Sequence, residues 1–429
     1  MKGPFLMEFL HVMPPSQRMM SGYLFMLKQY FMSSGEDVHK IMYNNEVFKA
    51  DSGLLMFDNT VHFPDMGKGK LKKFLYIKNA FEHADRIVFH CFQPDDKWLL
   101  TTYLLRKHLS KAVWVIWGID LYNFEVSSKT LAGRIRNKIN LDLRRRMRYP
   151  VAISEADVDV YQEKIGTYPV LCGAYPFMDA RFFQMDTFLK ENNRQKAEYA
   201  KKIETGELEE DYLLHILPNG QAPAQYDGRT RVLVGHNAFP FNNHIKSIDA
   251  VRRFVMMDGG EKIELCMPLN YGETSLSKNV SYIDALIQYC STLAVPFHVS
   301  YLKSMLTAND YTRYLSTIDI GIFNAERQSG LGNILQLLYM GKKVYMTQKN
   351  PLFSFLTEKG FEIHDTEELN TITLEEFLKP VQTPFPNPWI KSSRNIDSVA
   401  AVWDKIFGCI RGEIEPVETL KQCLKMLGN

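Results

Sequence analysis

Apolar positions along the chain alternate between short runs of strand length and longer segments with helical spacing. In the first half, the short runs occupy residues 8–12, 38–43, 54–57, 86–92, 112–117, 151–154 and 169–173. In the second half, they occupy residues 231–235, 262–267, 296–301, 318–323, 343–347 and 362–365. Strands that alternate with helical segments predict a parallel sheet covered by helices. The pattern therefore predicts an α/β protein with two doubly wound sheets.

The alternation stops at residues 179–228, and this break divides the chain. Charged helical sequence fills the first part of the break, and the turn-rich sequence PNGQAPAQYDG fills the second. We therefore predict a first domain at residues 1–178, a helical linker at 179–228 and a second domain at 229–385. Residues 386–429 are predicted to be helices that pack back across the junction. A length of 429 residues agrees with two domains of about 200 residues each.

The composition excludes several classes of protein. A net charge of +2 argues against a dedicated nucleic-acid binder, whose affinity depends on a strongly basic face. The six cysteines form no C-x-x-C pair and have no histidine at metal-ligand spacing, which favours free thiols in a reducing cytoplasm. No run reaches the roughly 18 apolar residues that a membrane span needs, so any membrane contact is expected to be peripheral.

Residues 318–351 combine a strand, a glycine-bearing loop, a helix and a second strand. Gly330 and Gly332 stand at the predicted helix start, where missing side chains let backbone N–H groups reach an anion that the helix dipole favours. Arg327, just upstream, is a candidate charged partner. The segment predicts a phosphate-binding βαβ unit, although glycines at a strand-to-helix turn also serve packing alone.

Two other strand ends in the second half carry candidate ligand-binding residues. Gly235 ends the first strand, and the following loop brings Asn242 and His244 to a helix start, which suits a diphosphate or a sugar hydroxyl. Helix capping by Asn242 or Asn243 is the alternative. Tyr271 follows the next strand, where its ring can stack on a nucleobase or pack in the core or a lid.

Polar residues also close two predicted strands of the first half. His90 lies in the run at residues 86–92, and Asp120 follows the run at 112–117. Open α/β sheets bind ligands at the carboxyl ends of their strands, so both residues are candidates for a ligand site. For Asp120, capping of the following turn is the alternative role.

Asp157 and Asp159 form a D-x-D pair, the pattern by which some transferases hold a metal ion on a nucleotide. The pair lies at a predicted helix start after a strand, with Ser154 as the predicted N-cap. Acidic residues at a helix start are favoured by the helix dipole. We therefore expect a helix-terminal role for the pair, and no metal or other cofactor.

Basic residues cluster within residues 134–148. They are Arg134, Arg136, Lys138, Arg144, Arg145, Arg146 and Arg148. Apolar residues are interleaved with them, which describes a basic amphipathic segment. Such a segment suits an anionic membrane surface, at about 1 kcal/mol per basic residue near the surface. An ordinary solvated helix is the alternative.

Five pieces of the sequence, in the same order, resemble the TDP-N-acetylfucosamine:lipid II N-acetylfucosaminyltransferase family, glycosyltransferase family 56. The pieces are WGIDLY at 117–122, VG followed by NNHI at 242–245, MPLNY at 267–271, RQSGLGN at 327–333 and KNP at 349–351. The resemblance implies a GT-B architecture, in which two Rossmann-like doubly wound domains face each other across a cleft. It also implies that the second domain binds most of the donor nucleotide and that the first binds the acceptor.

The resemblance implies transfer of a sugar from a nucleotide diphosphate donor, with a TDP-linked acetamido-dideoxyhexose such as N-acetylfucosamine favoured. The implied acceptor is a polyprenyl-diphosphate-linked glycan of surface polysaccharide synthesis, handled in the cytoplasm at the inner face of the cell membrane. In a metal-independent site, amides at a helix start and polar or cationic side chains stabilise the departing diphosphate. The expected donor-site residues are Gly235, Asn242, His244, Tyr271 (base), Arg327, Gly330, Leu331, Gly332, Asn333 and Asn350 (ribose or sugar).

On the acceptor side, Asp120 is the first choice for a general base or a sugar-orienting carboxylate. His90 is the second choice and Glu326 the third. Two other functions fit the same two-domain pattern. A nucleotide-sugar 2-epimerase would convert the donor without an acceptor, and a non-catalytic glycan- or lipid-binding subunit would have no affinity for nucleotides.

Overall fold

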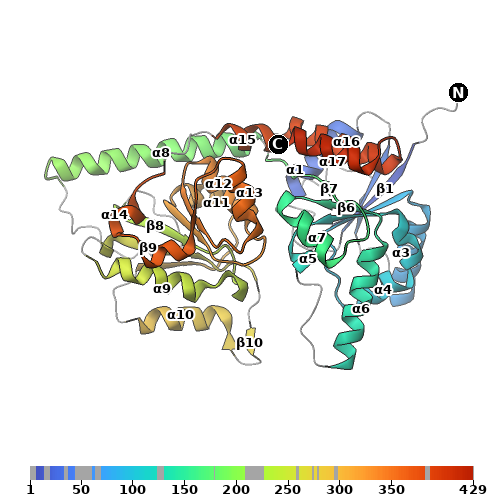
Figure 1. Cartoon of the computed structure of the whole chain (residues 1–429), viewed down its shortest axis with the longest axis horizontal. Helices are drawn as coiled ribbons and strands as arrows, with labels where there is room; N and C mark the ends of the chain where they lie inside the picture. The colour runs from blue at the N-terminus through green and yellow to red at the C-terminus, as the bar shows by residue number, and fades with distance from the viewer. Residues whose placement is uncertain are drawn as a thin grey trace. The chain divides into compact units, whose positions relative to one another are not determined.

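Two parallel sheets, one in each of two units, organise the chain (Figure 1). The computed structural model describes residues 6–13, 20–32, 37–43, 60–62, 69–122, 130–177, 179–207, 227–257, 260–272, 275–277, 280–293, 298–381 and 387–428. The first unit comprises Met1–Met178 and Ser392–Asn429, and the second comprises Asp179–Lys391. The last helices of the chain thus belong to the same unit as its first strands.

The sheet of the first unit has the strand order β3-β2-β1-β4-β5-β6-β7 within the described residues. Its strands are β1 (Glu8–Val12), β2 (Val38–Tyr43), β3 (Thr60–His62), β4 (Arg86–His90), β5 (Ala112–Ile116), β6 (Tyr149–Ala152) and β7 (Leu171–Cys172). All neighbouring strands are parallel. The order reverses between β1 and β4, the kind of switch point at which doubly wound sheets bind ligands.

Helices cover both faces of this sheet because both faces of its strands are apolar. In β1, Phe9 packs against Phe407 with 5.2 Å between ring centroids, whereas Leu10 lies in the opposite cluster with Phe81. One face carries α3 (Lys70–His83), α4 (Asp96–Leu104), α6 (Leu131–Arg146) and α7 (Val158–Lys164), and the other carries α1 (Met20–Met26), α16 (Ile396–Arg411) and α17 (Pro416–Met426). Shorter helical segments are η1 (Leu27–Met32), η4 (Arg106–Lys111), α5 (Ile119–Tyr122) and η5 (Glu155–Asp157).

The main sheet of the second unit has the order β12-β9-β8-β13-β14-β15. Its strands are β8 (Thr230–Val234), β9 (Ile263–Pro268), β12 (His298–Leu302), β13 (Ile320–Phe323), β14 (Lys343–Met346) and β15 (Ile363–Asp365), all parallel. A short antiparallel pair, β10 (Ser275–Ser277) and β11 (Val280–Ser281), is separate. The switch point of the main sheet lies between β8 and β13.

The helices of the second unit also cover both faces of its sheet. They are α8 (Asp179–Glu204), η8 (Pro240–Asn242), α9 (His244–Val255), η9 (Gly260–Lys262), α10 (Tyr282–Thr292), α11 (Ala308–Ser316), α12 (Leu331–Tyr339), α13 (Pro351–Glu358), η10 (Thr366–Asn370) and α14 (Leu374–Leu378). The helix α15 (Pro388–Arg394) spans the boundary between the two units. On α9, Ile248, Val251 and Phe254 recur at helical spacing and are fully buried beneath the sheet. The long helix α8 packs against this unit, where Phe182 contacts Tyr339 at 5.2 Å between ring centroids.

Every predicted strand run overlaps a strand of the structure, except the run at 54–57, which lies outside the described residues. The strands β3, β10 and β11 are not predicted, because they have only two or three residues and no apolar run. Most of the predicted linker after α8 also lies outside the described residues. In the described part of the chain, no helix has both the length and the apolarity needed to cross a membrane.

Candidate functional site

The loops after β8 and β13 meet at the switch point of the second unit. Gly235 follows β8 with a φ of 67°, and Gly330 precedes α12 with a φ of 74°. A Cβ atom on Gly330 would lie 3.0 Å from His236 Nδ1, and a Cβ atom on Gly235 would lie 2.7 Å from His244 Nε2. Both positions therefore need glycine for the left-handed backbone, and Gly330 also for the close approach of the loop after β8.

The first turn of α12 has the features of an anion site. No side chain caps the helix, whose N-cap residue is Gly330. The first N–H groups of an α-helix, here those of Leu331 and Gly332, have no acceptor within the helix and lie at the positive end of its dipole. A Cβ atom on Gly332 would meet no described atom within 4 Å. Packing within the described chain therefore does not require a glycine at this position.

Arg327 lies next to this turn and is held by an aromatic ring. Its guanidinium carbon is 3.5 Å from the centroid of the Phe241 ring, a cation–π contact that connects the loops after β8 and β13. Burial lowers the pKa of His236 to about 3, and electrostatic interactions with His244 and Arg327 add to this shift. The imidazole is therefore neutral near pH 7.

His236 is a further polar residue at this edge, and the sequence pattern does not predict it. It is 5% exposed, and its Nε2 lies 2.7 Å from Asn237 Nδ2 and 3.0 Å from Ser329 Oγ. Its Nδ1 faces Gly330 and has no hydrogen-bond partner among the described residues. An unpaired polar atom in a buried site is costly unless a ligand or water completes it. In the sequence, the one feature that could have identified His236 as a site residue is its position directly after Gly235, at the end of a strand.

The neighbouring amides determine which ring nitrogen of His236 carries the proton. Asn237 Oδ1 accepts hydrogen bonds from Phe239 N at 3.0 Å and from Asn242 Nδ2 at 2.7 Å, which fixes the orientation of the Asn237 amide. Asn237 Nδ2 then donates to His236 Nε2. In a neutral ring the proton consequently lies on Nδ1. The His236 Nδ1–H group thus points toward the start of α12 as a hydrogen-bond donor.

Asn242 and His244 are buried and make hydrogen bonds that hold the loop after β8 in place. Asn242 is 2% exposed and donates within the loop, to Asn237 Oδ1 and to Phe239 O at 3.0 Å. His244 is fully buried, with Nδ1 2.9 Å from Tyr282 OH, and burial lowers its pKa to about 4. The capping alternative is not observed, because the N-cap of α9 is Asn243 and its side chain makes no capping bond.

The other predicted donor-site residues differ in exposure. The Tyr271 side chain is 48% exposed, and its backbone oxygen accepts from Ala238 N at 2.7 Å. Asn333 Nδ2 donates to Tyr311 OH at 2.9 Å. Asn350 is fully buried as the N-cap of α13, and its Nδ2 donates to Ala325 O at 2.9 Å. Tyr271 therefore presents its ring at the surface, whereas Asn350 holds the loop after β13 in place.

Asp120 occupies the carboxyl edge of the first unit's sheet, but it is 1% exposed. Its Oδ2 accepts from Phe92 N at 2.8 Å and from Trp114 Nε1 at 2.6 Å, and its Oδ1 accepts from Trp117 N at 2.9 Å. Burial raises its pKa, while these donors and the nearby Arg144 oppose the rise. The three bonds connect the ends of β4 and β5. Catalysis by Asp120 stays a prediction, and the geometry favours a positioning role for its carboxylate.

We expect Asp120→Asn to destabilise the first unit, because an amide offers one acceptor oxygen where the carboxylate offers two. In either orientation, the new NH2 group would face a buried backbone or indole donor. Such a mismatch costs about 1–3 kcal/mol, or a fall in Tm of about 2–10 °C. Thermal unfolding tests this, with the exposed Asp159→Asn as control. An unchanged Tm would contradict the bonding scheme, and near-normal turnover would remove Asp120 from the catalytic role.

His90 is also buried, and both of its ring nitrogens are bonded within the protein. Its Nε2 lies 3.1 Å from His11 Nδ1, and its Nδ1 lies 2.7 Å from Tyr175 OH. Burial lowers its pKa to about 3, so the ring is neutral near pH 7. The catalytic role of His90 stays a prediction. In this geometry His90 can influence a ligand only through its hydrogen bond to Tyr175. The third choice, Glu326, is exposed and paired with Lys349 at 2.8 Å.

The D-x-D residues point in different directions. Asp157 is fully buried and accepts from Tyr122 OH at 3.0 Å, whereas Asp159 is exposed. Burial raises the pKa of Asp157 to about 7, and the charge of Asp120 adds to the rise. Asp157 stands at the N-cap position of α7 without a side-chain capping bond. The two carboxylates therefore do not converge on one site.

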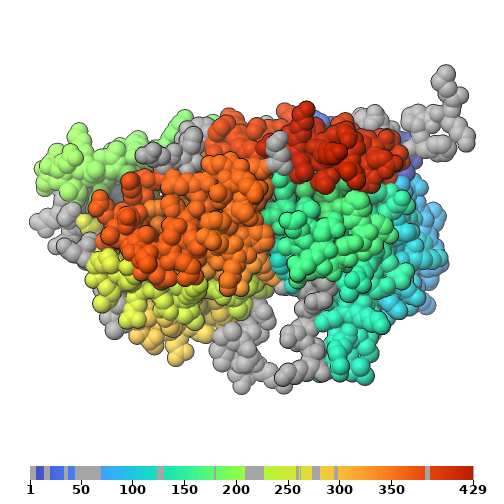
Figure 2. Space-filling model, in the orientation of Figure 1, coloured from blue at the N-terminus to red at the C-terminus, as the bar shows by residue number. Residues whose placement is uncertain are grey.

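Helix α6 contains most of the basic segment, and its two halves differ. Arg144 is 1% exposed and donates to Phe92 O at 2.7 Å and to Asp120 O at 3.2 Å, so it belongs to the strand-edge network. The N-terminal half extends away from the sheet of its unit (Figures 1 and 2). There, Leu131 and Ile135 are 69% and 51% exposed. The predicted basic surface therefore excludes Arg144.

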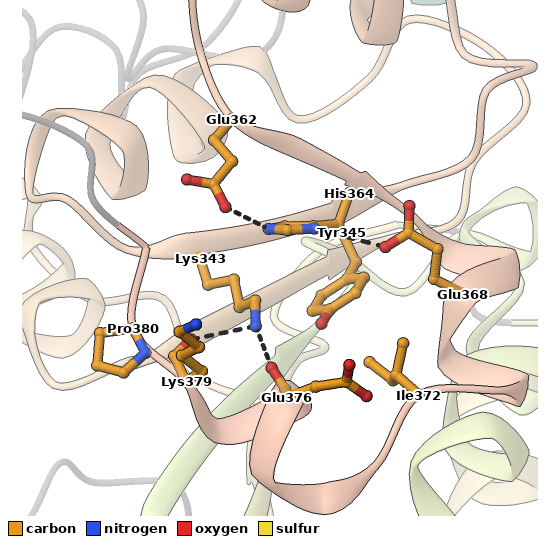
Figure 3. Close-up of a pocket in the computed structure, with 9 residues that line it drawn as sticks. All are labelled: Lys343, Tyr345, Glu362, His364, Glu368, Ile372, Glu376, Lys379 and Pro380. Carbon is orange, nitrogen blue, oxygen red and sulfur yellow. Dashed lines mark hydrogen bonds and ion pairs between the residues drawn. The ribbon is translucent and has the colours of Figure 1, made fainter.

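A cavity of about 460 Å³ lies on β14 and β15, toward their amino ends (Figure 3). It is lined by Lys343, Tyr345, Glu362, His364, Glu368, Ile372, Glu376, Lys379 and Pro380. Two of its lining side chains have partners within it: Lys343 Nζ donates to Glu376 O at 2.6 Å, and His364 lies 3.1 Å from Glu362 and 3.4 Å from Glu368. The loops with Gly235 and Gly330 lie at the carboxyl edge, so this cavity is separate from them.

The sequence profile of the family described as "4-alpha-L-fucosyltransferase glycosyl transferase group 56" matches residues 215–380, within the second unit. Residues 215–380 are thus similar to glycosyltransferase family 56. The match includes the candidate donor-site residues of the second unit, from Gly235 to Asn350. The match confirms the resemblance read from the short motifs over these residues, and it supports a transferase. The motif WGIDLY at 117–122 lies outside the matched residues.

Solved structures share the fold of this chain at low sequence identity. HepE of Anabaena, solved with UDP and glucose, gives a TM-score of 0.56 at 12% identity, over 98% of this chain and 99% of that one. WaaG, a glycosyltransferase of lipopolysaccharide biosynthesis, gives 0.51 at 10%, over 99% and 100%. The UDP-GlcNAc 2-epimerase of Neisseria meningitidis, bound to UDP-GlcNAc, gives 0.51 at 12%, over 94% and 99%. These likenesses confirm the predicted GT-B fold, which transferases and epimerases share.

Proposed function

We propose that the second unit binds a nucleotide diphosphate sugar at the start of α12 and that the chain transfers the sugar to a lipid-linked glycan. The observation that carries this proposal is the convergence of three kinds of donor. They are the first-turn amides of α12, the stacked guanidinium of Arg327 and the Nδ1–H group of His236. Backbone N–H groups, a fixed cation and a neutral donor together suit a diphosphate.

The charge that develops on the departing diphosphate is the main obstacle to sugar transfer. Donors already aimed at that charge in a partly buried site stabilise the transition state without reorganising, and removing one such donor typically costs about 100- to 1000-fold in kcat. Leu331, Gly332, Arg327 and His236 are placed for this task. Asn242 and His244 hold the loop that presents His236. Tyr271, with its exposed ring, is proposed to stack on the base.

The favoured donor is a TDP-linked acetamido-dideoxyhexose such as N-acetylfucosamine, and the favoured acceptor is a polyprenyl-diphosphate-linked glycan of surface polysaccharide synthesis. The family match supports the fucosyl class of sugar. The acceptor is proposed to bind at the carboxyl edge of the first unit, near Asp120 and Tyr175. Backbone donors recognise the diphosphate and leave the choice of sugar to other contacts.

Nucleotide binding is testable by thermal shift, because a ligand of the folded state raises the apparent Tm by mass action. We expect TDP to give the largest shift among TDP, UDP, GDP and CMP. Arg327→Ala should reduce that shift and raise the donor KM at least tenfold. Arg313→Ala is the matched control, since it removes another guanidinium that is stacked 4.4 Å from an aromatic ring, that of Phe188. No shift with any nucleotide would favour a non-catalytic binding subunit.

We also propose that α6 places the first unit on the cytoplasmic face of the inner membrane. Its N-terminal half combines the exposed Leu131 and Ile135 with the exposed Arg134 and Lys138. Apolar side chains beside basic ones favour the boundary of an anionic bilayer. The basic residues Arg145 and Arg148 further along the chain are exposed as well.

Replacing Arg134 and Lys138 together by glutamate should weaken binding to vesicles that contain anionic lipid. The loss is expected to be about 2 kcal/mol, or about 30-fold in affinity, because each basic residue near the surface contributes about 1 kcal/mol. Co-sedimentation measures the effect at low and high salt. The same change at Lys201 and Lys202, exposed at the end of α8, is the control for net charge. Equal binding by both double variants would contradict a role for α6.

A further inference from the structure

Three buried histidines form a hydrogen-bonded chain in the first unit. His39 Nδ1 lies 2.9 Å from His11 Nε2, and His11 Nδ1 lies 3.1 Å from His90 Nε2. His90 Nδ1 lies 2.7 Å from Tyr175 OH, which also accepts a hydrogen bond from Trp117 Nε1 at 2.9 Å. The histidines are 0–1% exposed, whereas Tyr175 is 8% exposed. The chain therefore runs from the core toward the sheet edge.

The strand registers explain how these residues meet. His39 is paired with Phe9, and His11 lies two residues further along β1. His11 is in turn paired with Val88, and His90 lies two residues further along β4. Residues two apart on a strand point to the same face of the sheet. The chain thus crosses three strands diagonally and ends at their carboxyl edge.

The three rings must share one tautomer. Burial lowers the pKa of each ring, to about 3 for His39 and His90 and well below the usual value for His11, so each carries one N–H group. Every N···N contact needs one donor and one acceptor. The protons therefore lie either all on Nδ1, toward Tyr175, or all on Nε2, away from it.

The far end of the chain favours the first arrangement. His39 Nε2 has no hydrogen-bond partner among the described residues. With protons on Nε2, this end would bury an unpaired N–H group, which is rarer in proteins than an unpaired acceptor. With the protons on Nδ1, the unpaired atom His39 Nε2 is a hydrogen-bond acceptor and leaves no N–H group unpaired.

We infer that the histidine chain turns the Tyr175 hydroxyl into a hydrogen-bond donor for an oxygen of the acceptor glycan. Its oxygen accepts from both His90 Nδ1–H and Trp117 Nε1–H, which uses both of its lone pairs. Its own proton then takes part in neither of these hydrogen bonds and is left to donate to a ligand. His90, His11 and His39 are positioning residues that act through Tyr175. This role rests on the proposed transferase function.

The tautomers are measurable without any activity. In the full-length protein with ¹⁵N-labelled histidine, long-range ¹H–¹⁵N correlation spectra should show protonated Nδ1 and bare Nε2 for all three rings near pH 7. His39→Gln and His90→Gln assign the signals. Protonated Nε2 atoms would overturn the inference, because Tyr175 would then donate to His90. This readout stands even if the protein transfers no sugar.

Kinetics test the role of the hydroxyl. Tyr175→Phe should raise the KM for the acceptor about three- to tenfold, the worth of one neutral hydrogen bond, and leave the donor KM unchanged. Tyr23→Phe is the matched control, because it removes a buried hydroxyl from a ring only 5.3 Å away and should leave both KM values unchanged. An unchanged acceptor KM for Tyr175→Phe would overturn the assignment. Equal effects of the two substitutions would do so as well.

Discussion

Gly332→Ala is expected to lower donor affinity about 100-fold while leaving the fold intact. The new methyl group would lean toward the helix start, since Cα–Cβ bonds in a helix tilt that way, and would occupy the space of a bound phosphate oxygen. Losing one or two amide bonds to a charged group costs about 3 kcal/mol, which corresponds to the stated factor. Within the described chain the methyl group meets no atom within 4 Å, and alanine favours a helix more than glycine does.

Calorimetric titration with nucleoside diphosphate, combined with thermal unfolding, checks this expectation. The matched control is Gly133→Ala, which makes the same change in the first turn of α6, a helix of the other unit. The control should bind nucleotide as the wild type does. If Gly332→Ala retained both its Tm and its nucleotide affinity, the phosphate groups would not lie at α12.

Acidification is expected to destabilise the first unit steeply below about pH 6.5. The pKa values of His11, His39 and His90 lie far below that of an unfolded histidine, so the unfolded state binds up to three more protons. Stability is therefore fully present above pH 6.5 and is lost as the pH falls toward 3. Each group contributes about 1.4 kcal/mol per pH unit. Asp157, whose pKa is raised to about 7, and Asp120 act in the opposite direction.

The net slope is expected to be about 2–3 kcal/mol per pH unit, which is large against a typical stability of 5–15 kcal/mol. Denaturant unfolding at pH 7.5, 6 and 5 measures it. His39→Gln should reduce the slope by about 1.4 kcal/mol per pH unit. A stability that stays constant between pH 7.5 and 5 would show that these rings titrate as exposed histidines do.

Local patterns in the sequence were sufficient to predict the two sheets and the strand ends at which the candidate site residues lie. Apolar runs and the glycines at 330 and 332 report backbone conformation directly, so the strand–loop–helix unit around α12 was predicted. The sequence KNP also held an unused signal, because Asn350 directly before a proline is a typical N-cap with proline at the first helical position. Its role as the cap of α13 was therefore predictable.

Other features depend on strand register and helix rotation, which one sequence does not display. The His39–His11–His90 chain exists only because β2, β1 and β4 are paired with a particular offset. Arg144 resembles its basic neighbours in sequence, but the rotation of α6 turns it inward onto Phe92 and Asp120. The roles of these histidines and of Arg144 become visible only from their burial and hydrogen-bond partners in the structure.

The most direct test of the central claim is mass spectrometry of a polyprenyl-diphosphate-linked glycan incubated with the protein and a panel of TDP-, UDP- and GDP-linked sugars. The proposed function predicts that the glycan gains the mass of one sugar residue, that one nucleoside diphosphate is released per sugar, and that Arg327→Ala abolishes most of this product. It also predicts no change of the donor when the acceptor is omitted. A glycan of unchanged mass, together with an isomerised nucleotide sugar in the absence of acceptor, would contradict it.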